Sequence, residues 1–169
     1  MNQRIPQFKP FLDQSEIDSV AECISDNWIT EGKRSNEFID LIKNITGSRY
    51  VSLAPNGTLA IDLALVGCGI GPGDEVLVPD FTFIATANAV VMTGAKPVFV
   101  DICDDLHINL NDAKIKLTPN TKAILPVHIY GTACDMETIT KFAKEHNLLV
   151  VEDAAQAINV KWNEKHAGT

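Results

Sequence analysis

Hydrophobic positions near the N-terminus follow helical spacing. Residues 13–16 (Asp-Gln-Ser-Glu) fit a capping box, and apolar residues then recur one turn apart over 17–24. The stretch 28–33 breaks this pattern. A second helix is expected from Ser35 to Gly47, which suits the position after a helix end. We expect the apolar faces of both helices to pack in a core.

From Tyr50 onward the pattern changes to short apolar runs that end in polar turns. The expected strands are YVSL (50–53), EVLVP (75–79), KPVFV (96–100), KAILPVHI (122–129) and LLVVE (148–152). Helices are expected between them over 58–67, 84–94, 109–117 and 135–146. Apolar strands that are separated by helices are typical of a parallel sheet with helices on both faces. The pattern therefore predicts an α/β fold with right-handed crossovers.

Composition is typical of a packed globular protein. The chain has 169 residues, of which 46% are hydrophobic and 21% charged, which disfavours disorder and allows a core to form. Acidic residues number 22 and basic residues 14, and no basic stripe is present, which disfavours nucleic acid as a partner. No apolar run is long enough for a membrane helix, and the first residues lack the apolar region of a signal peptide.

The cysteines Cys23, Cys68, Cys103 and Cys134 lie far apart, and no His cluster accompanies them. This spacing disfavours a zinc site and a disulfide framework. We therefore expect reduced thiols, a cytoplasmic location and no metal site.

Ligands of open α/β sheets bind beyond the carboxyl ends of the strands, so the residues at these ends are the candidates for chemistry. Asn56-Gly57-Thr58 opens a helix, where free N–H groups and the helix dipole suit a phosphate, although the same residues also make an ordinary turn. Phe81 and Phe83 follow the next strand, and one of them either covers a flat ligand or packs in the core.

Glu152-Asp153 ends the most hydrophobic strand. The Asp153 carboxylate is a candidate base, metal ligand or partner for a protonated ring nitrogen, and its alternative role is to cap the next segment. The Gln156 amide can reach the same space. His128 is either a core residue or a ligand, and a catalytic triad around it would have to assemble in space. The glycines at 67–73 fit no dinucleotide fingerprint and precede a strand, which disfavours a nicotinamide enzyme.

Five ordered blocks together resemble the N-terminal half of the DegT/DnrJ/EryC1/StrS nucleotide-sugar aminotransferases. The blocks are NGTLAIDLAL, GIGPGDEVLVPDFTFIATANAV, GAKPVFVDI, TKAILPVHIYG and VVEDAAQAI. The opening IPQFKPFL…WITEGK is also similar to the start of the family. The resemblance implies a three-layer α/β/α large domain like that of aspartate aminotransferase, with pyridoxal 5′-phosphate (PLP) as cofactor.

The resemblance also implies roles for the candidate residues. It places the PLP phosphate at Gly57 and Thr58, the stacking aromatic at Phe83, the pyridine nitrogen partner at Asp153 and a contact to the ring 3-oxygen at Gln156. A carboxylate near the ring nitrogen agrees with the chemistry, because PLP is an electron sink only while that nitrogen is protonated.

The function implied is transfer of an amino group from an amino acid, with glutamate as donor, to a nucleotide-linked keto-sugar. The expected setting is amino-sugar synthesis for cell-surface polysaccharide, including the O-antigen of lipopolysaccharide, by a homodimer. A sugar dehydratase of the same family and a truncated, non-catalytic ligand-binding module remain alternatives.

The chain departs from the family pattern in three respects. Pro55 replaces a small polar residue, which removes a phosphate hydrogen bond, and Asn159 stands where glycine is usual. The Schiff-base lysine of the family is expected beyond Thr169, so this chain alone is expected to be inactive. We accordingly expect a helical segment over 1–47 and the first part of the PLP-binding domain over 48–169, without the rest of that domain or the small C-terminal domain.

Overall fold

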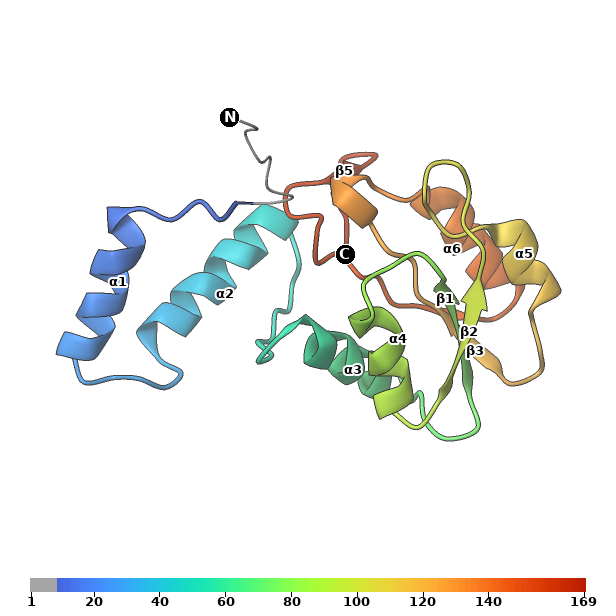
Figure 1. Cartoon of the computed structure of the whole chain (residues 1–169), viewed down its shortest axis with the longest axis horizontal. Helices are drawn as coiled ribbons and strands as arrows, with labels where there is room; N and C mark the ends of the chain where they lie inside the picture. The colour runs from blue at the N-terminus through green and yellow to red at the C-terminus, as the bar shows by residue number, and fades with distance from the viewer. Residues whose placement is uncertain (1–8) are drawn as a thin grey trace, which may run out of the picture. The chain divides into compact units, whose positions relative to one another are not determined.

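The structure is a computed structural model that describes residues 9–169 (Figure 1). The chain forms two compact units, of which the first ends at Phe38 and the second is Ile39–Thr169. This division falls within helix α2 (Lys33–Thr46). The domain boundary expected after residue 47 stays a proposal.

The first unit contains helix α1 (Gln14–Ser25), which begins at the predicted capping box. The Asp13 carboxylate accepts a hydrogen bond from the Ser15 N–H at 2.8 Å, and the Glu16 carboxylate accepts one from the Asp13 N–H at 2.7 Å. Neither α1 nor α2 has a buried residue, so the expectation that the apolar faces of both helices pack in a core is wrong for this chain. In the second unit, the sheet covers the apolar faces of the helices. Residues 9–38 contain no strand that could do the same.

The second unit alternates helices and strands nearly as predicted. Its elements are α3 (Gly57–Gly67), β1 (Glu75–Pro79), α4 (Ala85–Met92), β2 (Lys96–Val100), α5 (Leu110–Ile115), β3 (Thr121–Ile124), the 3-10 turn η1 (Ile129–Gly131), α6 (Met136–Glu145), β4 (Leu149–Val150), β5 (Lys161–Trp162) and β6 (Lys165–His166). The first four strands form one sheet in the order β2-β1-β3-β4. All of its pairings are parallel, which confirms the predicted α/β class.

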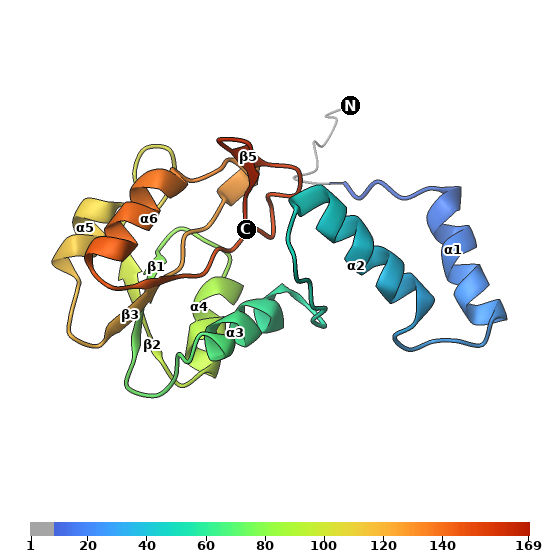
Figure 2. The ribbon, with the colours of Figure 1, turned by 180° about the vertical axis from the view of Figure 1, so that it is seen from behind.

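Alternate residues of β1 face two separate cores. Val76 and Val78 pack in a cluster with α3 and α4, whereas Leu77 belongs to a second cluster with α5 and α6. Figures 1 and 2 show α3 and α4 on one side of the strands and α5 and α6 on the other. The second unit therefore has three layers.

Two connections leave the centre of this sheet in opposite directions. The connection from β1 to β2 passes through α4 on one face, and the connection from β3 to β4 passes through α6 on the other. Because β1 and β3 are neighbours, the crevice between their carboxyl ends is a topological switch point, where open α/β sheets bind ligands.

Three segments differ from the sequence-based expectations. Residues 50–53 form no strand, because an apolar segment becomes a strand only where a neighbour pairs its backbone, and the sheet of the described residues holds no partner for them. β3 and β4 are shorter than predicted, and beyond them only Val127 and Asp153 form a bridge. The antiparallel pair β5–β6 was not expected.

Asn159 adopts a left-handed backbone conformation with φ of +61°. Asn populates this region several times more readily than most residues other than glycine. The turn for which glycine is expected is therefore kept despite the substitution.

At the amino end of the sheet, the nearly buried carboxylate of Glu75 has two donors. It accepts hydrogen bonds from the Thr118 hydroxyl at 2.6 Å and from the Lys96 ammonium at 2.9 Å. These two bonds, first that from Thr118, lower the pKa of Glu75 below its usual value of 4.5. A carboxyl whose pKa is lower in the folded state stabilises the fold above its unfolded-state pKa, and this contribution is lost as the pH falls through the folded-state pKa.

We therefore expect Glu75→Gln to lower the free energy of unfolding by about 1–2 kcal/mol at neutral pH. The difference from the unmodified chain should shrink as the pH falls below 4.5. Urea unfolding at several pH values measures it, with Glu145→Gln on the exposed side of α6 as the control. A difference that stays constant across this pH range would contradict the assigned hydrogen bonds.

Candidate functional site

A cavity of about 290 Å³ lies at the carboxyl ends of the strands. Its walls come from the start of α3, the loop after β1, and the segments after β3 and β4. The structure brings together all of the predicted site residues on this one lining: Gly57, Thr58, Phe83, Asp153 and Gln156. The phosphate and ring-nitrogen positions implied by the resemblance thus face the same space, although their roles remain proposals.

The start of α3 supplies hydrogen-bond donors for an anion. Asn56 is the N-cap, and its side chain accepts a hydrogen bond from the Leu59 N–H at 3.0 Å. The N–H groups of Gly57 and Thr58 in the first turn have no intrahelical partner. A Cβ on Gly57 would have no atom within 4 Å, so the space beside it is open. Pro55 precedes the cap and offers no N–H, which leaves this cradle one donor short.

Asp153 presents a carboxylate that is only 7% exposed. Its Oδ2 accepts a hydrogen bond from the Thr86 hydroxyl at 2.7 Å, and its Oδ1 accepts one from the Ala155 N–H at 3.2 Å. Both partners are uncharged. A carboxylate in this setting is stabilised by a cationic ligand, because a buried charge otherwise lacks an opposite charge.

The amide of Gln156 is held in one orientation. Its Oε1 accepts a hydrogen bond from the backbone N–H of Tyr130 at 2.7 Å, so its NH₂ group is left to donate to a ligand. Tyr130 has φ of +53° and Gly131 has φ of +78°, and this left-handed turn aims the Tyr130 N–H at the amide. Sequence reasoning missed this contact, since Tyr130 carries no signal for a positive φ.

Neither aromatic residue after β1 packs in the core. Phe83 is 70% exposed and lines the cavity, whereas Phe81 is 40% exposed and meets the Tyr130 ring edge-on, with ring centroids 6.2 Å apart. The core alternative for the pair is therefore wrong. An exposed phenyl ring at the cavity suits stacking on a flat ligand.

His128, Glu152 and Cys134 lie together, as the triad alternative requires, but their chemistry does not suit catalysis. His128 is fully buried, its Nε2 lies 2.7 Å from Glu152 Oε2, and its Nδ1 accepts a hydrogen bond from the Cys134 N–H at 3.0 Å. Burial raises the pKa of the Cys134 thiol to about 12, and this thiol donates to the Val127 carbonyl. A protonated, buried thiol is not a nucleophile, so the group is structural.

Glu152 is also used internally. Its Oε2 accepts a hydrogen bond from the Gly168 N–H at 2.8 Å in addition to the contact with His128. Within residues 9–169, no group of three His, Cys, Asp or Glu side chains could hold a metal ion. In the same part of the chain, every helix is too short or too polar to span a membrane.

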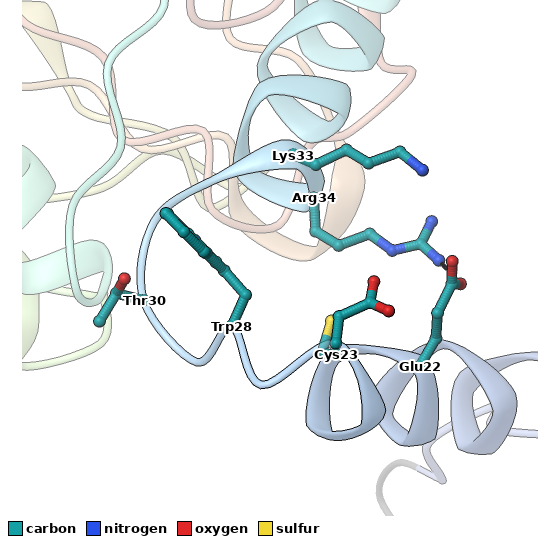
Figure 3. Close-up of a pocket in the computed structure, with 7 residues that line it drawn as sticks. Glu22, Cys23, Trp28, Thr30, Lys33 and Arg34 are labelled. Atoms are coloured by element: carbon teal, nitrogen blue, oxygen red, sulfur yellow. Dashed lines mark hydrogen bonds and ion pairs between the residues drawn. The ribbon is translucent and has the colours of Figure 1, made fainter.

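A cavity of about 270 Å³ in the first unit is a weaker candidate (Figure 3). Arg34 on its wall already pairs with Glu22 and with Glu37, and the Trp28 indole N–H donates to the Glu31 carbonyl at 2.9 Å. These charges are therefore matched within the unit. A third hollow of about 830 Å³ beside α6 and the β5–β6 pair contains none of the predicted site residues.

Residues 10–169 match the model of the DegT/DnrJ/EryC1/StrS aminotransferase family. A GDP-perosamine synthase of Caulobacter vibrioides is 47% identical over 169 residues, which cover 98% of this chain and 45% of that protein. The GDP-perosamine synthase of Escherichia coli O157:H7 is 41% identical over 167 residues, which cover 98% of this chain and 46% of that protein.

Among solved structures, NtdA from Bacillus subtilis with bound cofactor PMP is similar with a TM-score of 0.85 and 33% identity, covering 99% of this chain and 41% of that one. The chain thus spans less than half the length of the relatives that it matches. This similarity confirms the expected fold of the PLP aminotransferases, of which the chain covers the N-terminal part. The chain belongs to the DegT/DnrJ/EryC1/StrS aminotransferase family.

Proposed function

We propose that this chain forms part of a PLP-dependent enzyme that transfers an amino group from an amino acid, with glutamate as donor, to a nucleotide-linked keto-sugar. The observation that carries this proposal is the single cavity lined by all five predicted residues. Aminotransferases of this family depend on PLP, and the similar NtdA structure holds PMP, the aminated form of the cofactor.

The residues on the cavity wall fit this cofactor. The N–H groups at the start of α3 and the Thr58 hydroxyl would bind the phosphate, and Phe83 would stack on the ring and shield that side from water. The Gln156 NH₂ group would donate to the ring 3-oxygen. Asp153 would hold the proton on the ring nitrogen, because an adjacent carboxylate favours the cationic form. When bound, PLP supplies the electron sink that makes amino-group transfer accessible.

The finer assignments rest on the relatives. We propose that the Schiff-base lysine lies in the part of the family fold that this chain does not cover. We also propose a homodimer in the cytoplasm that makes an amino sugar for cell-surface polysaccharide such as the O-antigen. Support comes from the two similar GDP-perosamine synthases, which are enzymes of nucleotide-sugar chemistry by name.

Binding of PLP to the full-length protein tests the proposal. We expect a visible absorbance band from the bound cofactor, which glutamate bleaches as the amino group is transferred. Phe83→Ala should weaken PLP retention about fivefold, because stacking on an exposed ring contributes about 1 kcal/mol.

Phe81→Ala is the matched control, since it removes the same ring two residues away and outside the cavity lining. Equal retention by the Phe83 and Phe81 variants would contradict the stacking role. A protein that binds no PLP but binds NAD tightly would overturn the proposed function as a whole.

A further inference from the structure

Thr86 lies directly behind the cavity wall. It occupies the first turn of α4, is fully buried, and does not line the cavity. Its hydroxyl donates to Asp153 Oδ2 at 2.7 Å, across 67 positions of sequence. A buried hydroxyl that contacts the one carboxylate on the cavity lining is placed to control how that carboxylate points.

A second hydroxyl supports the first. The hydroxyl oxygens of Thr82 and Thr86 are 2.8 Å apart. A carboxylate only accepts hydrogen bonds, so the single proton of the Thr86 hydroxyl is committed to Asp153. Thr82 must then be the donor to Thr86, and the three groups form a chain of one polarity. Such chains are cooperative, which strengthens the bond to the carboxylate.

The two oxygens of Asp153 are held unequally. The Thr86 hydroxyl is a close side-chain donor to Oδ2, whereas the backbone N–H of Ala155 is a longer contact to Oδ1, at 3.2 Å. Together they fix the plane of the carboxylate. Without Thr86, the remaining long contact leaves the group free to rotate away from the cavity.

His128 is the other titratable side chain on the cavity lining, and its ring contacts groups other than the Asp153 carboxylate. Both ring nitrogens of His128 are engaged, Nδ1 by the Cys134 N–H and Nε2 by Glu152. The Glu152 carboxylate in turn contacts His128 and Gly168. Thr86 is therefore the side chain through which the protein orients Asp153.

We propose that Thr86, backed by Thr82, is a positioning residue that aims the Asp153 carboxylate at the protonated ring nitrogen of the cofactor. This inference rests on the proposed function and adds to it a residue outside the cavity. Loss of the hydroxyl weakens the hold of Asp153 on the ring proton, so the bound cofactor deprotonates at lower pH.

The test uses the full-length protein with PMP labelled with ¹⁵N in the ring. The ¹⁵N chemical shift reports protonation of the ring nitrogen directly, without turnover. We expect Thr86→Val to lower the midpoint of its deprotonation by about one pH unit and to weaken PMP binding about tenfold. Thr86→Ser keeps the hydroxyl and should restore the midpoint to within about 0.3 pH unit, and the PMP affinity to within about twofold, of the unmodified protein.

Thr121→Val is the matched control, because Thr121 is also nearly buried and its hydroxyl also takes part in hydrogen bonding, accepting from the Thr118 N–H at the opposite end of the sheet. It should leave the midpoint and the PMP affinity unchanged. If Thr86→Val does not fold, Thr82→Val, which removes the outer donor from a residue that itself lines the cavity, should move the midpoint in the same direction by less.

An unchanged midpoint in whichever of these two valine variants is folded would overturn the inference and leave the proposed function intact. An unmodified protein that binds neither PLP nor PMP would overturn both. A shift of equal size in Thr121→Val would also overturn the inference, since the effect would then follow from loss of packing.

Discussion

Asp153→Ala in the full-length protein is expected to lower the rate of amino-group transfer about a thousandfold while the second unit stays folded. Asp153 is the one carboxylate on the cavity lining. Without it, no lining residue offers a negative charge to the ring nitrogen, and the neutral ring is a poor electron sink. Steady-state kinetics with saturating PLP measure the rate, and circular dichroism checks the fold.

Asp104→Ala is the control for this variant, because Asp104 is an exposed acid in the loop after β2 and lies outside the cavity lining. It should leave the rate unchanged. Asp153→Asn should be nearly as slow as the alanine variant, since the amide is uncharged. Wild-type turnover in either Asp153 variant would refute the assigned role.

His128→Ala is expected to lower the free energy of unfolding by about 3–5 kcal/mol. The substitution empties a fully buried site, leaves the Cys134 N–H without its acceptor, and leaves the Glu152 carboxylate with the Gly168 N–H alone. The loss combines a cavity with an unsatisfied buried N–H, which is more than either contributes alone. Urea unfolding of the chain measures it.

A double-mutant cycle with Glu152→Gln isolates the part due to the His128–Glu152 contact. The two substitutions together should cost less than the sum of their separate effects, because each one alone leaves a buried partner behind. A loss below about 1 kcal/mol for His128→Ala would contradict the structural role assigned here.

The elements that were predicted closely are those whose ends are determined by residues within a few positions. β1 and β2 match the expected ranges because each is an apolar run bounded by polar residues or turns. α1 begins at a capping box that is readable from Asp13 and Glu16 alone. Such features depend on neighbours within a few positions, so a single sequence contains them.

The features that were missed depend either on a distant partner or on an unusual backbone conformation. Residues 50–53 have the composition of a strand but no neighbour in the sheet of the described residues. The β5–β6 turn uses positive φ at Asn163 and at Glu164, and glutamate gives no signal for that conformation.

In the candidate site, the lining residues were predicted from the sequence, whereas the contacts that orient them were not. The five lining residues were found through a family pattern that spans separate blocks of sequence, whereas their physical chemistry alone left each one ambiguous. The contacts that orient them were not accessible from sequence. The Tyr130 N–H reaches the Gln156 side chain across 26 positions, and the Thr86 hydroxyl reaches Asp153 across 67.

The cavity wall joins α3, the loop after β1 and the segments after β3 and β4, so it exists only when all of them are folded together. Binding of a ligand in this cavity is consequently linked to the unfolding of the second unit. A ligand that binds only the folded state, at a concentration a hundred times its dissociation constant, raises the unfolding free energy by about 2.7 kcal/mol. The concentration of cofactor therefore affects the stability of the whole second unit, including helices that the cofactor does not contact.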